Sequence, residues 1–245
     1  MSRIILEVCV DDAAGIAAAA EGGADRIELC AALGLGGLTP SAGLIEIARQ
    51  GPLPAMAMIR PRAGDFVWSR DEADAQLVEI AAIRAAGLAG VVIGASRADG
   101  SLDSDVLHEL VQAAKGLDIT LHRAIDLTPD IDDAMRICAD LGIHRVLSSG
   151  GARTALDGMP RLQQMEAHGV TVMPGGAVNA ANAAQFAQAL DLSEIHASCS
   201  AAAPTPPNPA VNAFGFQPEH ARATDARKVA ALRRALDHLG ARTSG

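Results

Sequence analysis

The chain has 245 residues, of which 49% are hydrophobic and only 2% aromatic, and its formal net charge is −9. An acidic chain with so few rings lacks the basic surface and stacking side chains of nucleic-acid binders, so we expect no nucleic-acid partner. No apolar run reaches the roughly 20 residues of a membrane span, so we expect no membrane partner. Four cysteines in a chain of this size suit a reducing compartment, and we predict a cytoplasmic protein.

Short apolar segments alternate with amphipathic segments along the whole chain. Strands are predicted at 4–10, 25–30, 54–60, 90–94, 118–123, 144–151, 170–176 and 194–198. Helices are predicted at 12–21, 41–49, 70–86, 104–115, 130–141, 158–168, 179–189 and 225–238. This alternation predicts an α/β protein, a (β/α)8 TIM barrel with eight parallel strands in a single domain over 1–245. An open doubly wound sheet is the alternative, although no G-x-G-x-x-G follows the first strand.

One long irregular stretch, 199–223, follows the eighth predicted strand and includes APTPPNP at 203–209. Proline at this density is incompatible with a helix interior or a central strand. We interpret the stretch as a loop within the same domain that crosses the mouth of the barrel. A surface excursion is the alternative.

The first two predicted strands carry the same Glu-x-Cys pattern, Glu7 with Cys9 and Glu28 with Cys30. Residues two apart in a strand point to the same face, so each strand aims a carboxylate and a thiol to one side. Buried packing of the thiols, and an internal ion pair of the two glutamates with Arg60, are the structural alternatives. Repetition of the pattern on neighbouring strands favours a functional site.

Functional groups of such barrels lie at the C-terminal ends of the strands. Besides the two Glu-x-Cys pairs, the polar residues and glycines at these ends are Arg60, Arg62, His122, Arg123, Ser148, Ser149, Gly150, Gly175, Gly176, His196 and Ser198. Strand alternation turns His122, His196 and Ser198 inward. The opposite end of the barrel is predicted to carry almost no inward polar group.

Two glycine loops, SSGG at 148–151 and PGG at 174–176, follow the sixth and seventh strands. Free backbone N–H groups in such loops can bind an anion, and arginine adds charge-assisted hydrogen bonds. The expected substrate- or anion-binding residues are Arg62, Arg123, Ser149, Gly150, Gly175, Gly176 and Ser198. Tight turns without a ligand are the alternative use of these glycines.

Several segments resemble, in the same order, the CutC family of copper homeostasis proteins. The motifs are LEVCVD, GGADRIELC, GGLTPS, MIRPR, LHRA, MPGG and EIH, and the resemblance runs from Ile4 to about Ser198. It implies a (β/α)8 barrel, a cytoplasmic protein associated with copper handling, and a homo-oligomer. The stretch 199–223 departs from the family pattern.

Two functions fit these observations. In the first, the protein binds Cu(I), because thiolates select this ion and imidazole can complete the site, and the predicted ligands are Cys9, Cys30 and His196. Copper is then the ion that the protein binds or passes on.

In the second, a lyase, isomerase or hydrolase acts on a small anionic metabolite. Glu7 and Glu28 would transfer protons with His122 as partner, and Arg60 would hold the substrate. The residue pattern leaves open whether the protein is an enzyme. A scaffold with an internal ion-pair network is a third interpretation.

Overall fold

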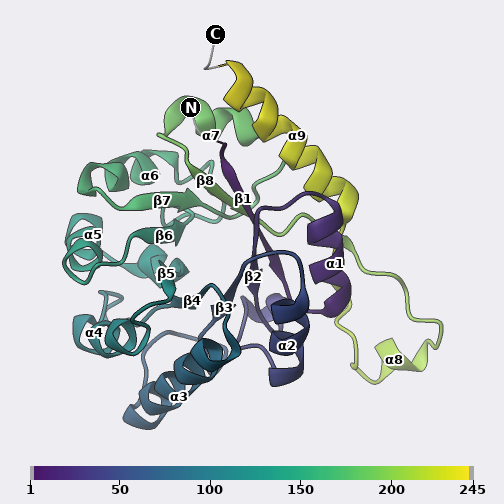
Figure 1. Ribbon diagram of the computed structural model, residues 1–245, viewed down its shortest axis with the longest axis horizontal. Coiled ribbons are helices and arrows are strands. Elements are labelled where there is room, and N and C mark those ends of the chain that lie inside the picture. Colours follow the sequence, from purple (N-terminus) through teal and green to yellow (C-terminus); the bar gives the residue numbers. More distant parts are fainter. Residues whose placement is uncertain (1–2, 243–245) are drawn as a thin grey trace.

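The computed structural model describes residues 3–242, which form a ring of strands surrounded by helices (Figure 1). The strands of the ring are β1 (Ile5–Val10), β2 (Arg26–Leu29), β3 (Ala55–Met58), β4 (Gly90–Ile93), β5 (Asp118–Leu121), β6 (Arg145–Ser148), β7 (Thr171–Pro174) and β8 (Glu194–Ala197). The surrounding helices are α1 (Ala13–Glu21), α2 (Ala42–Gln50), α3 (Arg70–Ala86), α4 (Ser104–Ala113), α5 (Ile131–Asp140), α6 (Met159–Met165), α7 (Ala183–Ala189) and α9 (Ala226–Arg242). Short 3-10 turns are η1 (Leu33–Leu35), η2 (Arg123–Leu127) and η3 (Glu166–His168).

The ring is a nearly closed barrel. Its strands are hydrogen-bonded in the order β7-β6-β5-β4-β3-β2-β1-β8, every pair is parallel, and β7 and β8 lie against each other at the seam. The predicted eight-stranded (β/α)8 barrel is therefore confirmed. The open doubly wound alternative is wrong, because the two end strands of the series meet.

Local sequence signals fix the starts of several helices. Asp12 accepts a hydrogen bond from the Gly15 amide at the start of α1, and Ser69 and Glu72 form a capping box at the start of α3. Two helices, α6 and α7, are shorter than predicted by several residues. The last residues of 158–168 tighten into η3, and the first residues of 179–189 form a turn in which the Asn182 side chain accepts from a backbone amide.

Strand alternation separates two apolar layers. Outward residues of β1, such as Leu6 and Val8, belong to the large core between the barrel and its helices. A smaller cluster of Cys30, Met56, Met58 and Val92 is buried separately from it. These positions follow the two-residue period of the strands.

An ion-pair plug fills the N-terminal end of the barrel. We use this name for four buried or nearly buried side chains, Glu7, Arg26, Arg145 and Glu194. Arg26 donates to Glu7 and Glu194, each at 2.5 Å, and Arg145 donates to Glu194 at 2.7 Å. The expectation that this end holds almost no inward polar group is wrong. Arg26 in β2 and Glu194 in β8 each lie two residues before a predicted site residue of the same strand, so they point to the same face of the strand as that residue.

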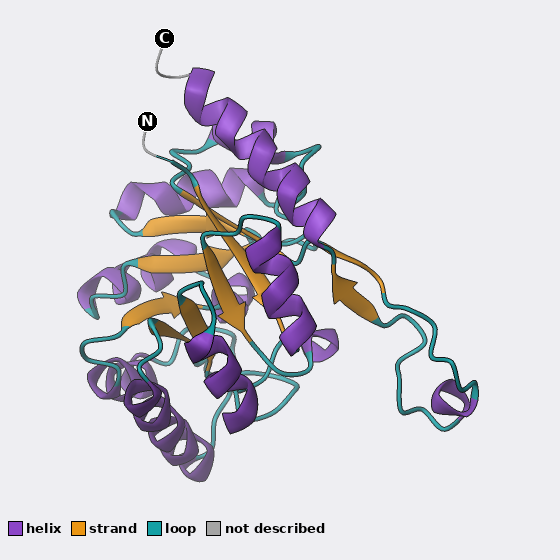
Figure 2. Cartoon of the chain, turned by 45° about the vertical axis from the view of Figure 1, so that its right-hand side comes forward, coloured by secondary structure: helices purple, strands orange, loops and turns teal. Residues whose placement is uncertain are grey.

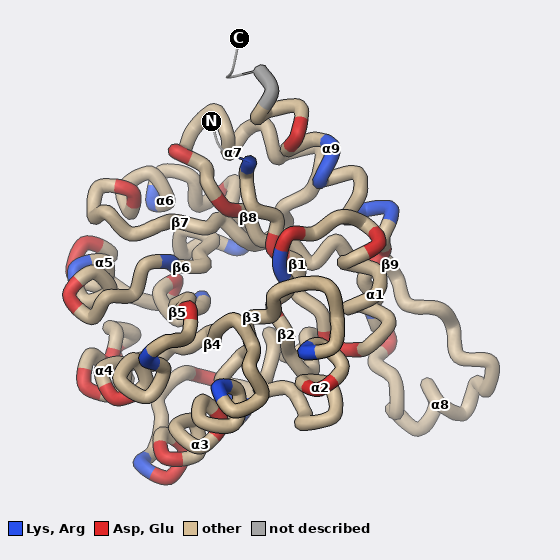
Figure 3. The backbone as a smooth tube through the Cα atoms, in the orientation of Figure 1, with Lys and Arg blue, Asp and Glu red and all other residues tan. Residues whose placement is uncertain are grey.

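The chain beyond β8 forms an antiparallel ribbon, β9 (Ser200–Ala202) and β10 (Arg222–Thr224), joined by an excursion that contains α8 (Ala210–Ala213). The excursion extends away from the barrel in both views (Figures 1 and 2). The interpretation as a loop across the mouth is wrong, and the surface excursion is the observed alternative. Figure 3 shows that it carries no charged residue around α8, whereas helices such as α3, α5 and α9 carry several.

Within residues 3–242, no helix is both long enough and apolar enough to cross a membrane.

Candidate functional site

A cavity of about 240 Å³ lies at the C-terminal ends of the strands. One wall comes from β8, β1 and β2 and presents His196, Cys9 and Glu28. The lining also includes Arg60, two residues beyond the end of β3, His122, directly after β5, and Phe66 from the loop after β3. Apart from Phe66, these residues lie at strand ends where the sequence predicts function.

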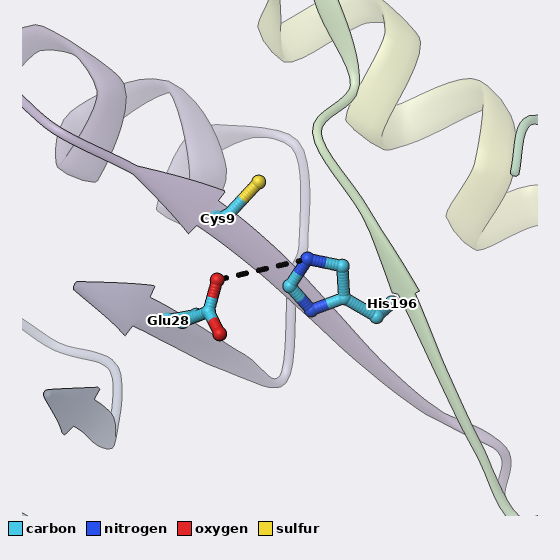
Figure 4. A group of neighbouring side chains, drawn as sticks. All are labelled: Cys9, Glu28 and His196. Atoms are coloured by element: carbon cyan, nitrogen blue, oxygen red, sulfur yellow. Dashed lines mark ion pairs between the residues drawn. The ribbon is translucent and has the colours of Figure 1, made fainter. Parts of the chain in front are cut away.

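Cys9, Glu28 and His196 form a buried group of three potential metal ligands (Figure 4). Their sulfur, oxygen and nitrogen atoms all lie within 4.8 Å of one another. Register explains the grouping, because Cys9 pairs with Glu28 across β1 and β2, and His196 pairs with Glu7 across β8 and β1. A tetrahedral site with bonds of 2.0–2.3 Å needs ligand separations of roughly 3.3–3.8 Å, so small side-chain adjustments suffice.

Glu7 orients His196 from below. Its Oε1 lies 2.9 Å from Nδ1 of His196, while its Oε2 accepts from Arg26. Burial opposes ionisation of Glu7, but the hydrogen bond from His196 and the charge of Arg26 outweigh it and hold the pKa of Glu7 at about 2. An ionised Glu7 can only accept, so Nδ1 carries the proton. The other ring nitrogen, Nε2, lies 3.8 Å from Oε2 of Glu28.

The two cavity-facing groups beside Glu7 have opposite responses to burial. Burial lowers the pKa of His196, but the nearby Glu28 and Cys9 reverse this and raise it well above its usual value. Burial raises the pKa of Glu28. Oε1 of Glu28 is buried without a hydrogen-bond partner among the described residues. The group thus combines a proton-holding imidazole with a carboxylate that retains an unused lone pair.

Cys30 does not join this group. It lies outside the cavity lining, packs with Met56 and Met58, and donates its S–H to Oε2 of Glu28 at 3.6 Å. Burial raises the pKa of its thiol well above the usual value. The structure therefore places Cys30 as a support for Glu28, whereas Cys9 and His196 line the cavity.

Arg60 is a buried cation whose hydrogen bonds go to backbone oxygens. Its terminal nitrogens donate to the carbonyls of Leu35, Gly37 and Gly64. No carboxylate pairs with it in the described part of the chain, so the expected ion pair with Glu7 and Glu28 is wrong, and Arg26 takes that place. Burial lowers the pKa of Arg60.

His122 is held as a neutral ring. Its Nδ1 accepts from the Ala124 amide at 3.1 Å, and burial, with the charge of Arg60, lowers its pKa to about 3. The proton of the neutral ring therefore lies on Nε2. The ring lies against Gly94, where an added Cβ would be 2.2 Å from Cε1 of His122. The centroids of the His122 and Phe66 rings are 4.7 Å apart.

The glycine loop after β6 is already filled by a carboxylate of the protein itself. Asp126, in η2, accepts from Ser148 Oγ, from the amides of Ser149 and Gly151, and from Ser149 Oγ. This is an anion cradle of the expected kind, but its anion is internal. Gly150 donates to Ser148 Oγ and packs against the backbone of Gly158, and neither Ser149 nor Gly150 lines the cavity.

The remaining predicted residues divide into two sets. Arg123, Gly175, Gly176 and Ser198 line the cavity, although Arg123 is paired with Asp126 at 2.7 Å. Arg62 lies outside it, because it pairs with Glu72 and Asp65 and stacks on Trp68.

Sequence reasoning missed Arg26, Glu194, Phe66 and Asp126. The first two lie two residues before Glu28 and His196 on the same strands, so strand alternation predicts that they point inward as well. Phe66 and Asp126 lie in loop and turn segments that the rule does not cover.

Fold and site together define the class of protein, a (β/α)8 barrel with a buried Cys–Glu–His group at the C-terminal strand ends. The sequence profile of the CutC family matches residues 4–201. A relative from Rhizobium meliloti (strain 1021), named as a family protein CutC, is 50% identical over 240 residues, which cover 97% of this chain and 98% of the relative. The chain belongs to the CutC family.

Solved structures agree with this assignment. The CutC protein from Streptococcus agalactiae, whose name connects it with copper homeostasis, superposes with a TM-score of 0.75 at 25% identity and covers 80% of this chain and 98% of that one. KGPDC from Streptococcus mutans superposes with a TM-score of 0.62 over 97% of this chain and 99% of that one. Its identity is 14%, so this second likeness supports the fold alone.

Proposed function

We propose that the protein binds a copper ion, as Cu(I), through Cys9 and His196, with Glu28 as the third ligand. The observation that carries this proposal is the bond between Nδ1 of His196 and Glu7. Ligating histidines commonly donate their second ring nitrogen to a carboxylate, which fixes the tautomer and leaves the other nitrogen for the metal. Here that free nitrogen faces Glu28 and shares a group with Cys9.

The donor chemistry supports copper. A thiolate is a soft ligand that selects Cu(I), imidazole suits copper, and the thioether of Met58 lines the same cavity. The solved relative from Streptococcus agalactiae is named for copper homeostasis, which agrees with the same ion. Binding displaces the Nε2 proton of His196 and requires the Cys9 thiolate, so affinity is expected to fall as the pH is lowered.

The test is an anaerobic competition titration with a strong Cu(I) chelator on wild type, Cys9→Ala and Cys138→Ala. Cys138 is also buried but lies in α5, outside the cavity lining, and serves as the matched control. Wild type and the control are expected to retain a single Cu(I) against the chelator, and Cys9→Ala is expected to lose it. Equal copper retention by all three proteins, or retention by none, refutes the proposal.

A second candidate function is an enzyme that acts on a small anionic metabolite, and the size of the cavity favours it. A bound water needs a cavity of only about 10–15 Å³, whereas this cavity has a volume of about 240 Å³ and can hold a larger molecule. His196, oriented by Glu7, and Glu28 would then transfer protons. With a substrate in hand, Glu28→Gln should lower kcat by roughly 100-fold or more while binding persists. An unchanged kcat would remove Glu28 from the chemistry.

We also infer a cytoplasmic location and assembly into a homo-oligomer. The four cysteines are free in the structure, which suits a reducing compartment. Phe214 and Phe216, 73% and 78% exposed, contact each other on the projecting excursion and are the kind of surface that protein partners cover. Sedimentation analysis of purified protein tests the assembly.

A further inference from the structure

Two residues that line the cavity outside the Cys–Glu–His group contain buried donors without partners in the described part of the chain. Nε of Arg60 and Nε2 of His122 both have no hydrogen-bond partner among the described residues. The two side chains are 5% and 3% exposed, and both line the cavity. Buried polar groups are nearly always satisfied, so two such donors in one wall point to a ligand.

The charge of Arg60 is also uncompensated. Arg62 and Arg123 near the mouth, and Arg26 and Arg145 in the ion-pair plug, each have a carboxylate partner. Among residues 3–242, the partners of Arg60 are neutral carbonyls and the face of Phe66, 5.0 Å from its guanidinium carbon. Burying an unpaired charge is costly, and an anion in the cavity would remove that cost.

His122 adds a donor whose direction of hydrogen bonding is fixed. Because its Nδ1 already accepts from Ala124, the remaining ring nitrogen of the neutral ring is the buried Nε2–H donor. Phe66 contacts both Arg60 and His122 and holds the two groups on one wall. A neutral imidazole N–H beside a guanidinium can donate hydrogen bonds to an oxyanion, whereas neither group offers a lone pair to a metal ion.

We propose that Arg60 and His122 bind the carboxylate of a small organic acid, with the rest of the molecule facing Cys9, Glu28 and His196. Two single N–H donors match the two oxygens of a carboxylate. A phosphate demands more donors, and the loop 148–151, one of the two glycine loops, is occupied by Asp126. The inference deepens the second candidate function by naming its substrate class. The binding step itself requires neither copper nor turnover.

The experiment uses metal-free protein with a chelator present, so that its result does not depend on copper. Acetate is titrated into uniformly ¹⁵N-labelled wild type, and the Nε2 resonance of His122 is followed by NMR. Acetamide, which has the same shape without the charge, and inorganic phosphate are titrated in parallel. Wild type should show a saturable shift with acetate and none with acetamide.

Two arginine variants complete the design. Arg60→Gln should weaken acetate binding by about 10- to 100-fold, as expected for loss of a hydrogen bond to a charged group. Arg62→Gln removes a guanidinium just outside the cavity and should bind acetate as wild type does. Urea unfolding of both variants verifies that they fold.

Three results would overturn the proposal. If acetate leaves the Nε2 resonance of wild-type His122 unchanged, the site is excluded without the need for any variant. Equal acetate affinity in wild type and a folded Arg60→Gln variant would show that Arg60 does not bind the carboxylate. Tighter binding of phosphate than of acetate would exclude the carboxylate class. A positive acetate result together with no copper binding would leave this inference standing and refute the copper proposal alone.

Discussion

Glu7 serves both the fold and the site. One of its oxygens accepts from Arg26 in the ion-pair plug, and the other accepts from His196 at the floor of the cavity. Removing one partner of a buried pair leaves the other charge uncompensated, which costs far more than the net contribution of the intact pair. The orientation of His196 and the stability of the barrel therefore depend on the same carboxylate.

Glu7→Gln is expected to destabilise the protein by about 3 kcal/mol or more, because Arg26 loses one of its two carboxylates and His196 loses its charged acceptor. Urea unfolding measures the change. Glu46→Gln is the matched control, since Glu46 pairs with Arg49 on the exposed surface of α2, where ion pairs contribute little. If both variants lose the same stability, the plug has no special weight.

At the scale of elements, the alternation of the strands is what could be predicted from sequence. It placed Cys9, Glu28 and His196 inward at one end of the barrel, and they do line the cavity. Extended by two residues, the same rule reaches Arg26 and Glu194. Apolar alternation reports only which face a side chain takes, so it could not show which glutamate pairs with which arginine.

The loops carried less information. The SSGG loop is predicted to bind a substrate anion, but Asp126 from a different segment takes up its donors. Phe66 reaches the cavity from the long loop after β3, where no periodicity constrains the chain. Contacts between segments distant in sequence depend on loop conformation, which residue patterns encode weakly.

The end of β4 illustrates how an element fixes the site. Gly94→Ala would place a Cβ 2.2 Å from Cε1 of His122 and should displace the ring, at a cost of about 1–3 kcal/mol for overpacking and with loss of acetate binding. Gly43→Ala, in α2 with no atom within 4 Å of the new Cβ, should be neutral or stabilising by up to about 1 kcal/mol. Unfolding curves of both variants check this. Unchanged stability and binding in Gly94→Ala would contradict the described packing.

At the scale of the whole molecule, His122 makes stability depend on pH. Its pKa is about 3 in the folded state and about 6.5 in an unfolded chain, so between these values only the unfolded state binds the proton. Stability should therefore rise with pH across this window, with a contribution of up to about 1.4 kcal/mol per pH unit, and be lost as pH falls.

Urea unfolding at several values between pH 4 and 6.5 measures this slope. His122→Gln should lack the contribution, and His108→Gln, exposed on α4, should keep the wild-type slope. The comparison uses slopes, so a uniformly less stable variant still gives an answer. Parallel slopes in wild type and His122→Gln would show that His122 titrates alike in both states.

The ion-pair plug has one more consequence, because it gives the cavity a closed floor. A molecule that enters past the strand ends must leave by the same opening, so of two bound molecules the last to arrive departs first. Cys9 and His196 lie within or beside β1 and β8, whereas Arg60 and His122 follow the ends of β3 and β5. An acid seated at the outer position would then act as a stopper, and the residence time of an ion beneath it would be set by the acid's departure.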